Sequence, residues 1–529
     1  MPIRGAGEGE VTSASCRTAR HNGRVTARRA PWVLAGVLAG IAGLATSYAT
    51  AMVLTIREAP VVAVAEMVIR LTPGPVAERA ISVLGHFDKP FLVGVVLLLL
   101  LGLFALAGVL ARGGWYRPLF VWFPLAGVGL VAVLSQRGAG AVDALPVAVG
   151  LLTWVTLHSA LTDALVRGQR RPDLESRERR VFLMVAGAVS VAAIGIAVAG
   201  RLVGAGRRHV EVSRRLLRIP GVTRRQAPAS TSVGLSGIAP WQTPNEDFYL
   251  IDTTIAKPTI EPEEWSLRIH GMVDRELTLS YSDLVSRRMT QSWITLNCVS
   301  NEVGGGLVGN ARWSGIRIAD LLADLGVSDD ADCVLQTSHD GWTCATPLEA
   351  LTDERDAMLA VAMNGHPLPI EHGFPVRTIV PGLYGYVSAT KWVVDLEVST
   401  FAESTGYWTT KGWSAEGPVK IASRIDVPRS GDDVAAGPVS FGGVAWHQHT
   451  GVDFVEVQVD GGEWTRAELG GVPSVDTWVQ WAVTIDVPEG DHEVRVRATG
   501  KDGETQTSAV RSPDPDGATG WHAVEFSAG

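Results

Sequence analysis

Five long stretches without any Asp, Glu, Lys or Arg lie in the first 200 residues of this 529-residue chain. They are Trp32–Leu54, Phe91–Ala111, Pro118–Gln136, Ala144–Thr162 and Val181–Gly200. About 20 apolar residues in a helix cross the ~30 Å hydrocarbon core of a bilayer, and a soluble core helix seldom runs that far without a charge. The sequence therefore predicts a five-span transmembrane region, residues 32–200, after a cytoplasmic tail, residues 1–31.

The distribution of basic residues predicts the orientation of these spans. With the N-terminus inside, the cytoplasmic segments would carry 14 Lys+Arg and the outer loops 5. Such a bias is typical of cytoplasmic loops and places everything after Gly200 outside the cytoplasmic membrane. Eight arginines between residues 201 and 225 oppose this orientation. The apolar segment 59–86 is interrupted by charges, and we expect a loop or an interfacial amphipathic helix there.

A paired arginine precedes the fifth stretch. The run Arg179-Arg180-Val181-Phe182-Leu183 resembles a twin-arginine export signal. That route exports folded domains, so the later arginines need not fix the topology. The alternative is a plain cytoplasmic anchor for the span.

A second polar feature is His158, inside the fourth stretch. Haem ligation would need a facing ligand, but no other histidine lies in a span, which favours a polar residue that faces the bundle.

Charge and cysteine content exclude several functions. Residues 1–225 carry 27 Lys+Arg against 12 Asp+Glu, whereas residues 226–529 carry 19 against 43. An acidic half of this size argues against nucleic-acid binding, which needs a basic surface. The four cysteines, Cys16, Cys298, Cys333 and Cys344, form no CxxC or CxxCH motif. No haem or iron–sulfur cluster is therefore expected in this chain.

The second half divides into three segments by composition and by the pattern of its apolar residues. Residues 201–239 are rich in arginine and are predicted to be a stalk or linker. Residues 240–415 mix short apolar runs such as Trp265–Gly271 with helical patterns such as Ile318–Leu325, which predicts an α+β domain. Residues 416–529 show strand patterns separated by turns, including a hairpin signal at Asp460–Gly462. That pattern predicts an immunoglobulin-like β-sandwich.

Cys298 stands where an apolar run enters a polar, glycine-containing turn, in the sequence TLNCVSNEVGG. Three interpretations are open from the residues alone. The thiol could be a buried core group, a nucleophile, or a soft thiolate ligand for a metal held mainly by something else. No His/Asp partner for a nucleophile can be identified from the spacing.

Several further segments carry polar groups beside rigid turns. They are TPNEDFY, ARWSGIRIADLL, MNGHPLPIEHGFPVR and VSATKW. In this order, together with LNCVSNEVGG, they resemble the sulfite oxidase superfamily of molybdenum enzymes across about 290 residues from Thr243 to the C-terminus. The resemblance implies an α+β molybdopterin domain followed by the family's immunoglobulin-like dimerisation domain, and hence a homodimer among the expected assemblies.

The resemblance also assigns residues. Cys298 takes the position of the family's cysteine thiolate ligand to molybdenum, beside a molybdenum–molybdopterin cofactor. The pterin-binding positions correspond to Phe248, Tyr249, Thr337, His372, Arg377, Ser388 and Lys391. Cys333 is expected in the core. Cys344 is expected either in the core or in the lining of the active site, because it lies in the family's substrate-side loop.

The chain departs from the family at two substrate-side positions. Ile251 stands where sulfite oxidases have an arginine, and Trp342 stands where they have a tyrosine. Both are counted among the catalytic positions. The loss of a guanidinium and a phenol removes two groups that would bind a dianion. The methionine-sulfoxide reductase branch has an acidic residue two positions after the ligand cysteine, and here that residue is Ser300.

These observations predict a multi-pass oxidoreductase of the cytoplasmic membrane whose catalytic domain is extracytoplasmic. It would transfer an oxygen atom to or from a small sulfur or nitrogen oxide, with a separate cytochrome or quinone protein as electron-transfer partner. One alternative is a sulfoxide reductase of the methionine-sulfoxide type. Another is a non-enzymatic membrane scaffold that retains the fold.

Overall fold

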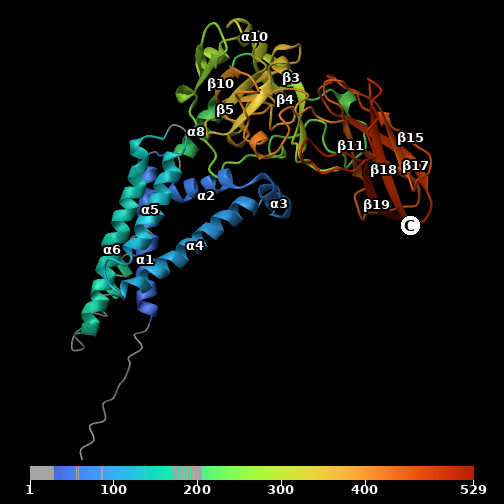
Figure 1. Cartoon of the computed structure of the whole chain (residues 1–529). Coiled ribbons are helices and arrows are strands. Elements are labelled where there is room, and N and C mark those ends of the chain that lie inside the picture. The colour runs from blue at the N-terminus through green and yellow to red at the C-terminus, as the bar shows by residue number, and fades with distance from the viewer. Residues whose placement is uncertain are drawn as a thin grey trace, which may run out of the picture.

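The N-terminal part of the chain is helical. The computed structural model describes residues 29–54, 56, 59–84, 87–136, 139–170 and 205–529, with scattered positions between 177 and 195. The helices of the first part are α1 (Ala30–Val53), α2 (Pro60–Leu71), α3 (Gly74–Leu84), α4 (Asp88–Ala111), α5 (Leu119–Leu134) and α6 (Leu145–Arg170). Helix α1 packs along α4 and α6, and α2 packs on α5. The long helices form a bundle below the rest of the molecule (Figure 1).

Three helical stretches, rather than the predicted five, are long and apolar enough to cross a membrane within the described residues. They are Ala30–Val53, Asp88–Ala111 and Ala141–Arg167. The predicted span Pro118–Gln136 forms the 16-residue α5 instead. At 1.5 Å per residue that helix rises about 24 Å, short of the ~30 Å hydrocarbon core. The predicted span Val181–Gly200 and the paired arginines before it lie largely outside the described residues.

Glycines let the long helices touch through their backbones. A Cβ at Gly36 of α1 would lie 2.1 Å from the carbonyl oxygen of Phe104 in α4, and one at Gly108 would lie 2.0 Å from that of Trp32. Small residues at such crossings are typical of helices that associate in lipid, where close van der Waals contact replaces the hydrophobic effect. His158 of α6 is buried against Trp122, with ring centroids 5.5 Å apart, so it faces the bundle.

The segment predicted to be a loop or an interfacial helix forms two helices, α2 and α3. Pro60 occupies the first turn of α2, where a missing backbone N–H has no cost. Both helices lie between the long helices and the rest of the molecule (Figure 1). The side chains of α2 therefore have two neighbours, the bundle below and the α+β region above.

The α+β region contains two five-stranded sheets. The first has the order β2 (Leu277–Ser280), β1 (Ser266–Gly271), β10 (Val393–Ser399), β5 (Cys333–Ser338) and β6 (Thr343–Pro347). The second has the order β3 (Thr290–Asn297), β4 (Val308–Arg317), β7 (Met358–Met363) and β8 (His366–Pro367), with β9 (Arg377–Ile379) also paired to β7. The connections include the short helices α9 (Tyr281–Val285), α10 (Ile318–Ala323) and α11 (Leu348–Thr352). This is the mixed architecture that the sequence predicted.

The C-terminal region is a β-sandwich. One sheet has the order β11 (Ala422–Val427), β13 (Gly437–Trp446), β17 (Val479–Val487) and β16 (Glu468–Leu469). The other has the order β12 (Asp433–Val434), β19 (His522–Ala528), β18 (Gly490–Gly500), β14 (Val452–Val459) and β15 (Thr465–Arg466). Alternate side chains of the strands fill a separate core that includes Phe441, Trp481 and Phe526. The immunoglobulin-like classification stays a prediction.

The segment predicted to be a stalk packs on the α+β region where it is described. Helix α8 (Ala205–Leu216) places Val210 in one apolar cluster with Phe248 and Met363. Arg214 donates to the carbonyl oxygen of Pro367 at 3.1 Å. This part of the chain is therefore a packed element rather than a free linker.

Candidate active site

Cys298 follows the last residue of β3 and begins the loop to β4. Its N–H donates to the carbonyl oxygen of Leu307 at 3.0 Å, and its own carbonyl accepts from the N–H of Asn301 at 3.1 Å. The residue is 8% exposed. Burial raises the pKa of the thiol, although hydrogen bonds with Ser300 oppose that shift. The thiol is therefore protonated at neutral pH, and a metal that bound it would displace the proton.

Arg377, at the start of β9, is a buried charge without a carboxylate partner. The residue is 2% exposed, and its guanidinium donates to the carbonyl oxygens of His372 at 3.1 Å and Ala389 at 3.3 Å. It also lies over the ring of Trp313, 5.1 Å from the centroid. No carboxylate of the described chain lies within ion-pair distance of it. Burial accordingly lowers the pKa of Arg377 to about 10.

His372 is held neutral beside Arg377. Its Nε2 lies 3.1 Å from the carbonyl oxygen of Asn245, and Phe248 meets the imidazole edge-on. Its Nδ1 is buried and has no hydrogen-bond partner within the described chain. Burial, Lys391 and Arg377, in that order, lower the pKa of His372 to about 3. An unpartnered buried nitrogen of this kind is costly unless a ligand satisfies it.

Tyr249 links this group to Cys298. Its ring stacks on Phe248, with centroids 5.3 Å apart. Burial raises the pKa of the Tyr249 phenol well above its usual value, a negative charge on Cys298 would raise it further, and Arg377 opposes the shift. The phenol therefore lies within electrostatic reach of both the thiol and the guanidinium, and it stays protonated.

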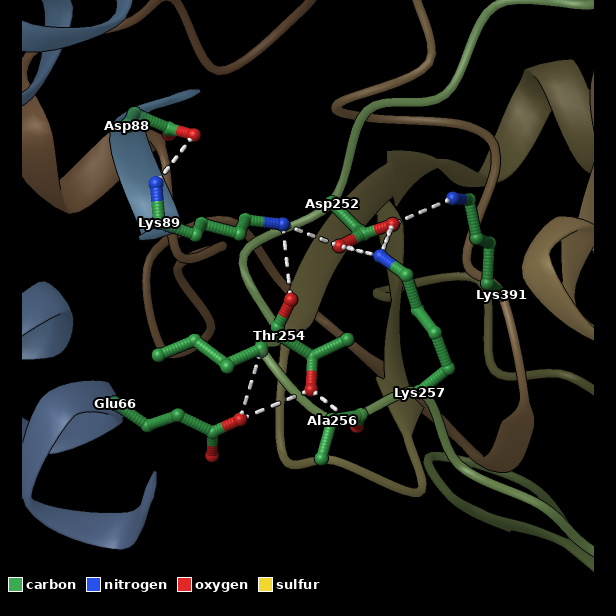
Figure 2. A network of polar contacts seen from close by, with 9 residues as sticks. Glu66, Asp88, Lys89, Asp252, Thr254, Ala256, Lys257 and Lys391 are labelled. Carbon is green, nitrogen blue, oxygen red and sulfur yellow. Dashed lines mark hydrogen bonds and ion pairs between the residues drawn. The ribbon is translucent and has the colours of Figure 1, made fainter. Parts of the chain in front are cut away.

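Lys391 ends on the carboxylate of Asp252. Its Nζ lies 3.0 Å from Oδ2 of Asp252, and the Lys391 side chain is 10% exposed. Lys257 also binds this carboxylate (Figure 2). So does Lys89, which lies at the start of α4 and places its Nζ 2.7 Å from Oδ1 of Asp252. Burial lowers the pKa of Lys391 to about 8 despite Asp252. Burial works against ionisation of Asp252, but the lysines hold the pKa of its carboxyl well below the usual range.

These groups fit an anionic ligand that offers hydrogen bonds. Arg377 is an uncompensated buried cation, the Nδ1 of His372 lacks a partner, and Lys391 belongs to a cluster with more ammonium groups than carboxylates. A buried charge is costly unless it is paired. A pterin cofactor with a phosphate would supply both the negative charge and the hydrogen-bonding partners, beside the thiol that the resemblance assigns to the metal.

Two predicted pterin residues have other contacts. The hydroxyl of Ser388 donates to the carbonyl oxygens of Leu383 at 3.1 Å and Tyr384 at 2.9 Å. Thr337 is buried in β5 opposite Asp395, in the other five-stranded sheet. The structure therefore gives the hydroxyl of Ser388 a local role and places Thr337 in the other sheet, whereas it brings Phe248, Tyr249, His372 and Arg377 together.

The other cysteines of this region are buried. Cys333 is fully enclosed in β5. Cys344 in β6 has its Sγ 3.2 Å from the hydroxyl of Thr390, and burial raises the pKa of its thiol to about 12. Of the two interpretations of Cys344, the structure supports core packing.

Of the two substrate-side positions, Trp342 lies in a cleft that α2 helps to line. Ile251 is 41% exposed, and Trp342 is half-buried. Trp342 lines a cleft together with Glu66, Ile69, Arg70, Thr253, Thr254, Asp340, Gly341 and Tyr407. One wall of this cleft thus comes from α2, and its ionisable side chains include two carboxylates and one guanidinium.

Sequence reasoning missed Tyr384 and Asp252. Tyr384 is close enough to Cys298 for a thiolate to affect it, and burial raises the pKa of its phenol to about 12. It lines a second cleft, between the Cys298 loop and the β-sandwich, together with Asn297, whose buried Oδ1 has no partner in the described structure. The aromatic–glycine run GLYGY was the available signal for Tyr384. Nothing local marked Asp252, because two of its partners are distant in sequence.

Comparisons with known proteins agree with this geometry. Residues 254–408 match the family described as the oxidoreductase molybdopterin binding domain. An uncharacterized oxidoreductase of Bacillus subtilis, YuiH, is 34% identical over 154 residues, which are 29% of this chain and 74% of that protein. The mitochondrial sulfite oxidase of Homo sapiens is 29% identical over 301 residues, which cover 48% of this chain and 55% of the human protein. The chain thus spans about half the length of the mammalian mitochondrial sulfite oxidases that it matches.

A solved structure is also similar in part. The sulfane dehydrogenase SoxCD from Paracoccus pantotrophus matches with a TM-score of 0.45 and 23% identity, over 57% of this chain and 83% of that chain. On the sequence relationships, the chain belongs to the sulfite oxidase superfamily of molybdopterin-dependent oxidoreductases.

Proposed function

We propose that this chain is a membrane-anchored, molybdopterin-dependent enzyme that transfers an oxygen atom to or from a small, uncharged sulfur or nitrogen oxide at the outer face of the cytoplasmic membrane. The observation that carries the proposal is the group Cys298, Tyr249, His372 and Arg377. In it, Tyr249 lies within electrostatic reach of a buried thiol and of an uncompensated guanidinium, and that guanidinium lies near an unpartnered imidazole nitrogen.

The residues of the proposed cofactor pocket have different roles. Cys298 would hold the metal, while His372, Arg377 and Lys391 would hold the pterin. When bound, molybdenum–molybdopterin supplies the two-electron redox chemistry of oxygen-atom transfer. Reduction of an oxide consumes two electrons and two protons and releases water, and the reverse reaction takes its oxygen from water. Tyr249 and Tyr384 stay protonated at neutral pH because burial raises the pKa of each, so they would act as hydrogen-bond donors rather than bases.

The cleft beside Trp342 supports an uncharged substrate. A dianion such as sulfite needs concentrated positive charge when it loses its water. The guanidinium expected at position 251 is replaced by the Ile251 side chain, and the cleft has Glu66 and Asp340 against Arg70. A sulfoxide or an organic N-oxide has a polar oxygen but no net charge, and therefore avoids this desolvation cost. The sulfoxide reductase direction is a second candidate, for which the same cleft is suited.

The contacts between α2, α4 and the α+β region support the outward orientation. Glu66 lies in the segment between the first two membrane stretches, Lys89 lies in the first turn of the second stretch, and both contact the α+β region. That segment belongs to the loops with few basic residues, which the positive-inside bias assigns to the outer side. The proposal further includes a separate electron carrier, a cytochrome or quinone protein, and a homodimer formed through the C-terminal region.

The experiment is a cofactor assay coupled to turnover. The full chain, purified in detergent, is analysed for molybdenum and pterin and then offered methionine sulfoxide, trimethylamine N-oxide and sulfite with a suitable redox dye. We expect close to one molybdenum per chain and faster turnover of an uncharged oxide than of sulfite. A protein that carries neither molybdenum nor pterin would instead support the non-enzymatic scaffold. Saturation by micromolar sulfite would refute the preference for an uncharged substrate.

A further inference from the structure

Three lysines from distant parts of the chain meet at one buried carboxylate. Lys391 of the VSATKW segment, Lys257 and Lys89 all place Nζ within hydrogen-bonding distance of Asp252 (Figure 2). The side chains are 10%, 20% and 24% exposed, and that of Asp252 is 8% exposed. Lys89 belongs to α4, a candidate membrane span, so the cluster joins the helical bundle to the α+β region.

The cluster carries more positive charge than it can neutralise. Asp252 offsets one of the three ammonium groups. The nearby Glu371 offsets a second through its effect on Lys257, but Arg377 adds a further cation that acts on Lys391. Four cations therefore face two carboxylates. Glu66 approaches the same segment, where its Oε1 accepts from the hydroxyl of Thr254 and the N–H of Ile255, both at 3.0 Å, and its carboxylate still leaves one of the four cations unmatched.

The ammonium groups keep donors available for another ligand. Each lysine has three N–H donors. Lys89 uses donors on Asp252 and on the carbonyl oxygen of Thr254 at 2.9 Å, and Lys391 donates to Asp252. A compact anion with several oxygens could take the remaining donors without breaking the contacts with Asp252.

The choice of lysine is itself unusual in this chain. Of its 46 basic residues only six are lysines, namely Lys89, Lys257, Lys391, Lys411, Lys420 and Lys501. Half of them lie on one carboxylate, and Lys89 is the single lysine among residues 1–225. A lysine presents a compact charge on a flexible stem, whereas arginine needs room for a planar fork. Three lysines suit convergence on a small tetrahedral anion.

We propose that Lys89 of α4 completes, with Lys257 and Lys391, a site for the phosphate of the pterin cofactor, so that the membrane-side helices supply part of the cofactor pocket. The inference rests on the proposed cofactor-dependent function and deepens it. Lys391 is the link, because its close neighbours include the pterin-pocket residue His372 as well as Asp252. The backbone contact is also tight, since a Cβ at Gly373 would lie 3.1 Å from Cα of Lys391.

A lipid phosphate offers the same chemistry and is the competing source, because Lys89 lies at the end of a membrane helix. Burial favours the pterin phosphate. Asp252 and Lys391 are enclosed by the α+β region, and Lys391 is within electrostatic reach of Arg377, deep in the pocket. A headgroup at the bilayer surface would not need so buried a site.

The test compares Lys89→Gln with the wild type and with Lys411→Gln. Lys411 is a matched control, because it spans the same junction but donates to the backbone carbonyls of Arg70 and Thr72, away from Asp252. Each full-length protein is purified from a host that makes the cofactor, and its pterin is measured by fluorescence after acid oxidation. We expect Lys89→Gln to retain about 10-fold less pterin after dialysis, since one charge-assisted contact is worth at least that factor. Lys411→Gln should match the wild type, and Lys89→Arg should recover part of the loss.

A second measurement, of phosphate binding, depends on neither cofactor insertion nor turnover. The same proteins are made in a host that cannot synthesise pterin, and binding of inorganic phosphate is measured by calorimetry. Lys89→Gln should weaken it about 10-fold. Unchanged pterin retention and phosphate affinity in Lys89→Gln would overturn the proposal. Equal losses in Lys89→Gln and Lys411→Gln would overturn it too, because they would indicate loosened docking.

The lipid alternative is decided in the same preparations. Bound phospholipid is counted by mass spectrometry, and binding to vesicles of phosphatidic acid is compared across the variants. A loss of bound lipid in Lys89→Gln with unchanged pterin would assign the cluster to a lipid headgroup and overturn the pterin assignment. A wild type that holds molybdenum and pterin but turns over no oxide would refute the proposed function alone, and would leave the phosphate site standing.

Discussion

Replacement of Asp252 by Asn should destabilise the protein strongly at neutral pH. The substitution keeps the shape of the side chain but removes the one negative charge that faces Lys89, Lys257 and Lys391. What remains is three ammonium groups around a neutral amide, in a place where the wild-type carboxylate is only 8% exposed. The perturbation therefore tests whether the cluster behaves as a buried ion network or as a surface one.

The burial of the four side chains sets the magnitude. Removal of one partner from a buried ion pair costs about 3–5 kcal/mol, whereas an exposed pair is worth about 0–1 kcal/mol. With exposures from 8% to 24%, we expect the Asp252→Asn protein to lie near the lower end of the buried range, about 3 kcal/mol. For a cooperative unit of 150–250 residues, 1 kcal/mol corresponds to roughly 2–4 °C, so Tm should fall by roughly 6–12 °C.

The pH dependence gives the prediction a sign. Because the folded-state pKa of Asp252 is depressed, its stabilisation is present above the unfolded-state value near 4 and is lost as the pH falls below it. On the alkaline side, Lys391 has a pKa of about 8 and loses its charge above that pH. The attraction in the wild type and the repulsion in the variant both weaken there. The difference in Tm should therefore be full at pH 6.5 and smaller at pH 9.5.

Thermal unfolding of the full chain in detergent, at those two pH values, measures the effect. Asp516→Asn is the control, because Asp516 pairs with Lys420 at 2.7 Å but its side chain is 48% exposed. That variant should lose no more than about 1 kcal/mol, or roughly 2–4 °C. Equal losses in the two variants, or a loss in Asp252→Asn that is the same at both pH values, would refute the assignment of a buried charge network.

Three further outcomes test the pocket itself. Cys298→Ala should abolish oxide turnover but retain pterin, because other residues hold the cofactor; full turnover by the variant would rule out the thiolate as the metal ligand. His372→Gln should flatten the pH profile of stability: with a folded-state pKa near 3 against 6.5 unfolded, the wild type should lose up to about 1.4 kcal/mol per pH unit as the pH falls between these values. The same slope in wild type and variant would show that His372 is not the buried neutral group. Ile251→Arg should lower the KM for sulfite by about 10-fold or more through a charge-assisted contact, and steady-state kinetics that show no change would place the substrate elsewhere.

The pattern around Cys298 shows what a sequence can predict. A strand of alternating and apolar residues followed by polar and glycine residues predicts a turn at the end of a strand, and β3 does end at Asn297, one residue before the cysteine. The mixed strands and short helices that surround it follow from local periodicity in the same way. Pattern alone left three roles for the thiol open, because the partners that distinguish them come from β9 and from the segment at Tyr249.

Length was the weak point of the membrane prediction. The prediction took the length of each uncharged stretch as the length of a helix. A helix spans the whole stretch only if its backbone stays helical to both ends. At Pro118–Gln136 the helix begins after Pro118 and ends before Ser135, so the apolar stretch is longer than the helix. The charged segment between residues 59 and 86, in contrast, is more helical than its pattern indicated, because it forms α2 and α3. One of its charges, which argued against a span, is the group that α2 presents to the α+β region, where the Glu66 carboxylate accepts from the hydroxyl of Thr254.

The lysine cluster was beyond local pattern, because Lys89 and Asp252 are separated by 163 residues. Its sequence signal was of another kind. In a chain that uses arginine for nearly all of its positive charge, a lone lysine at the head of an apolar helix indicates a demand that arginine does not meet. The structure explains this preference for lysine. Three cations approach one carboxylate within hydrogen-bonding distance, and three planar guanidinium groups would crowd there. Rarity of a residue type within a chain can therefore indicate a site even where spacing and periodicity cannot.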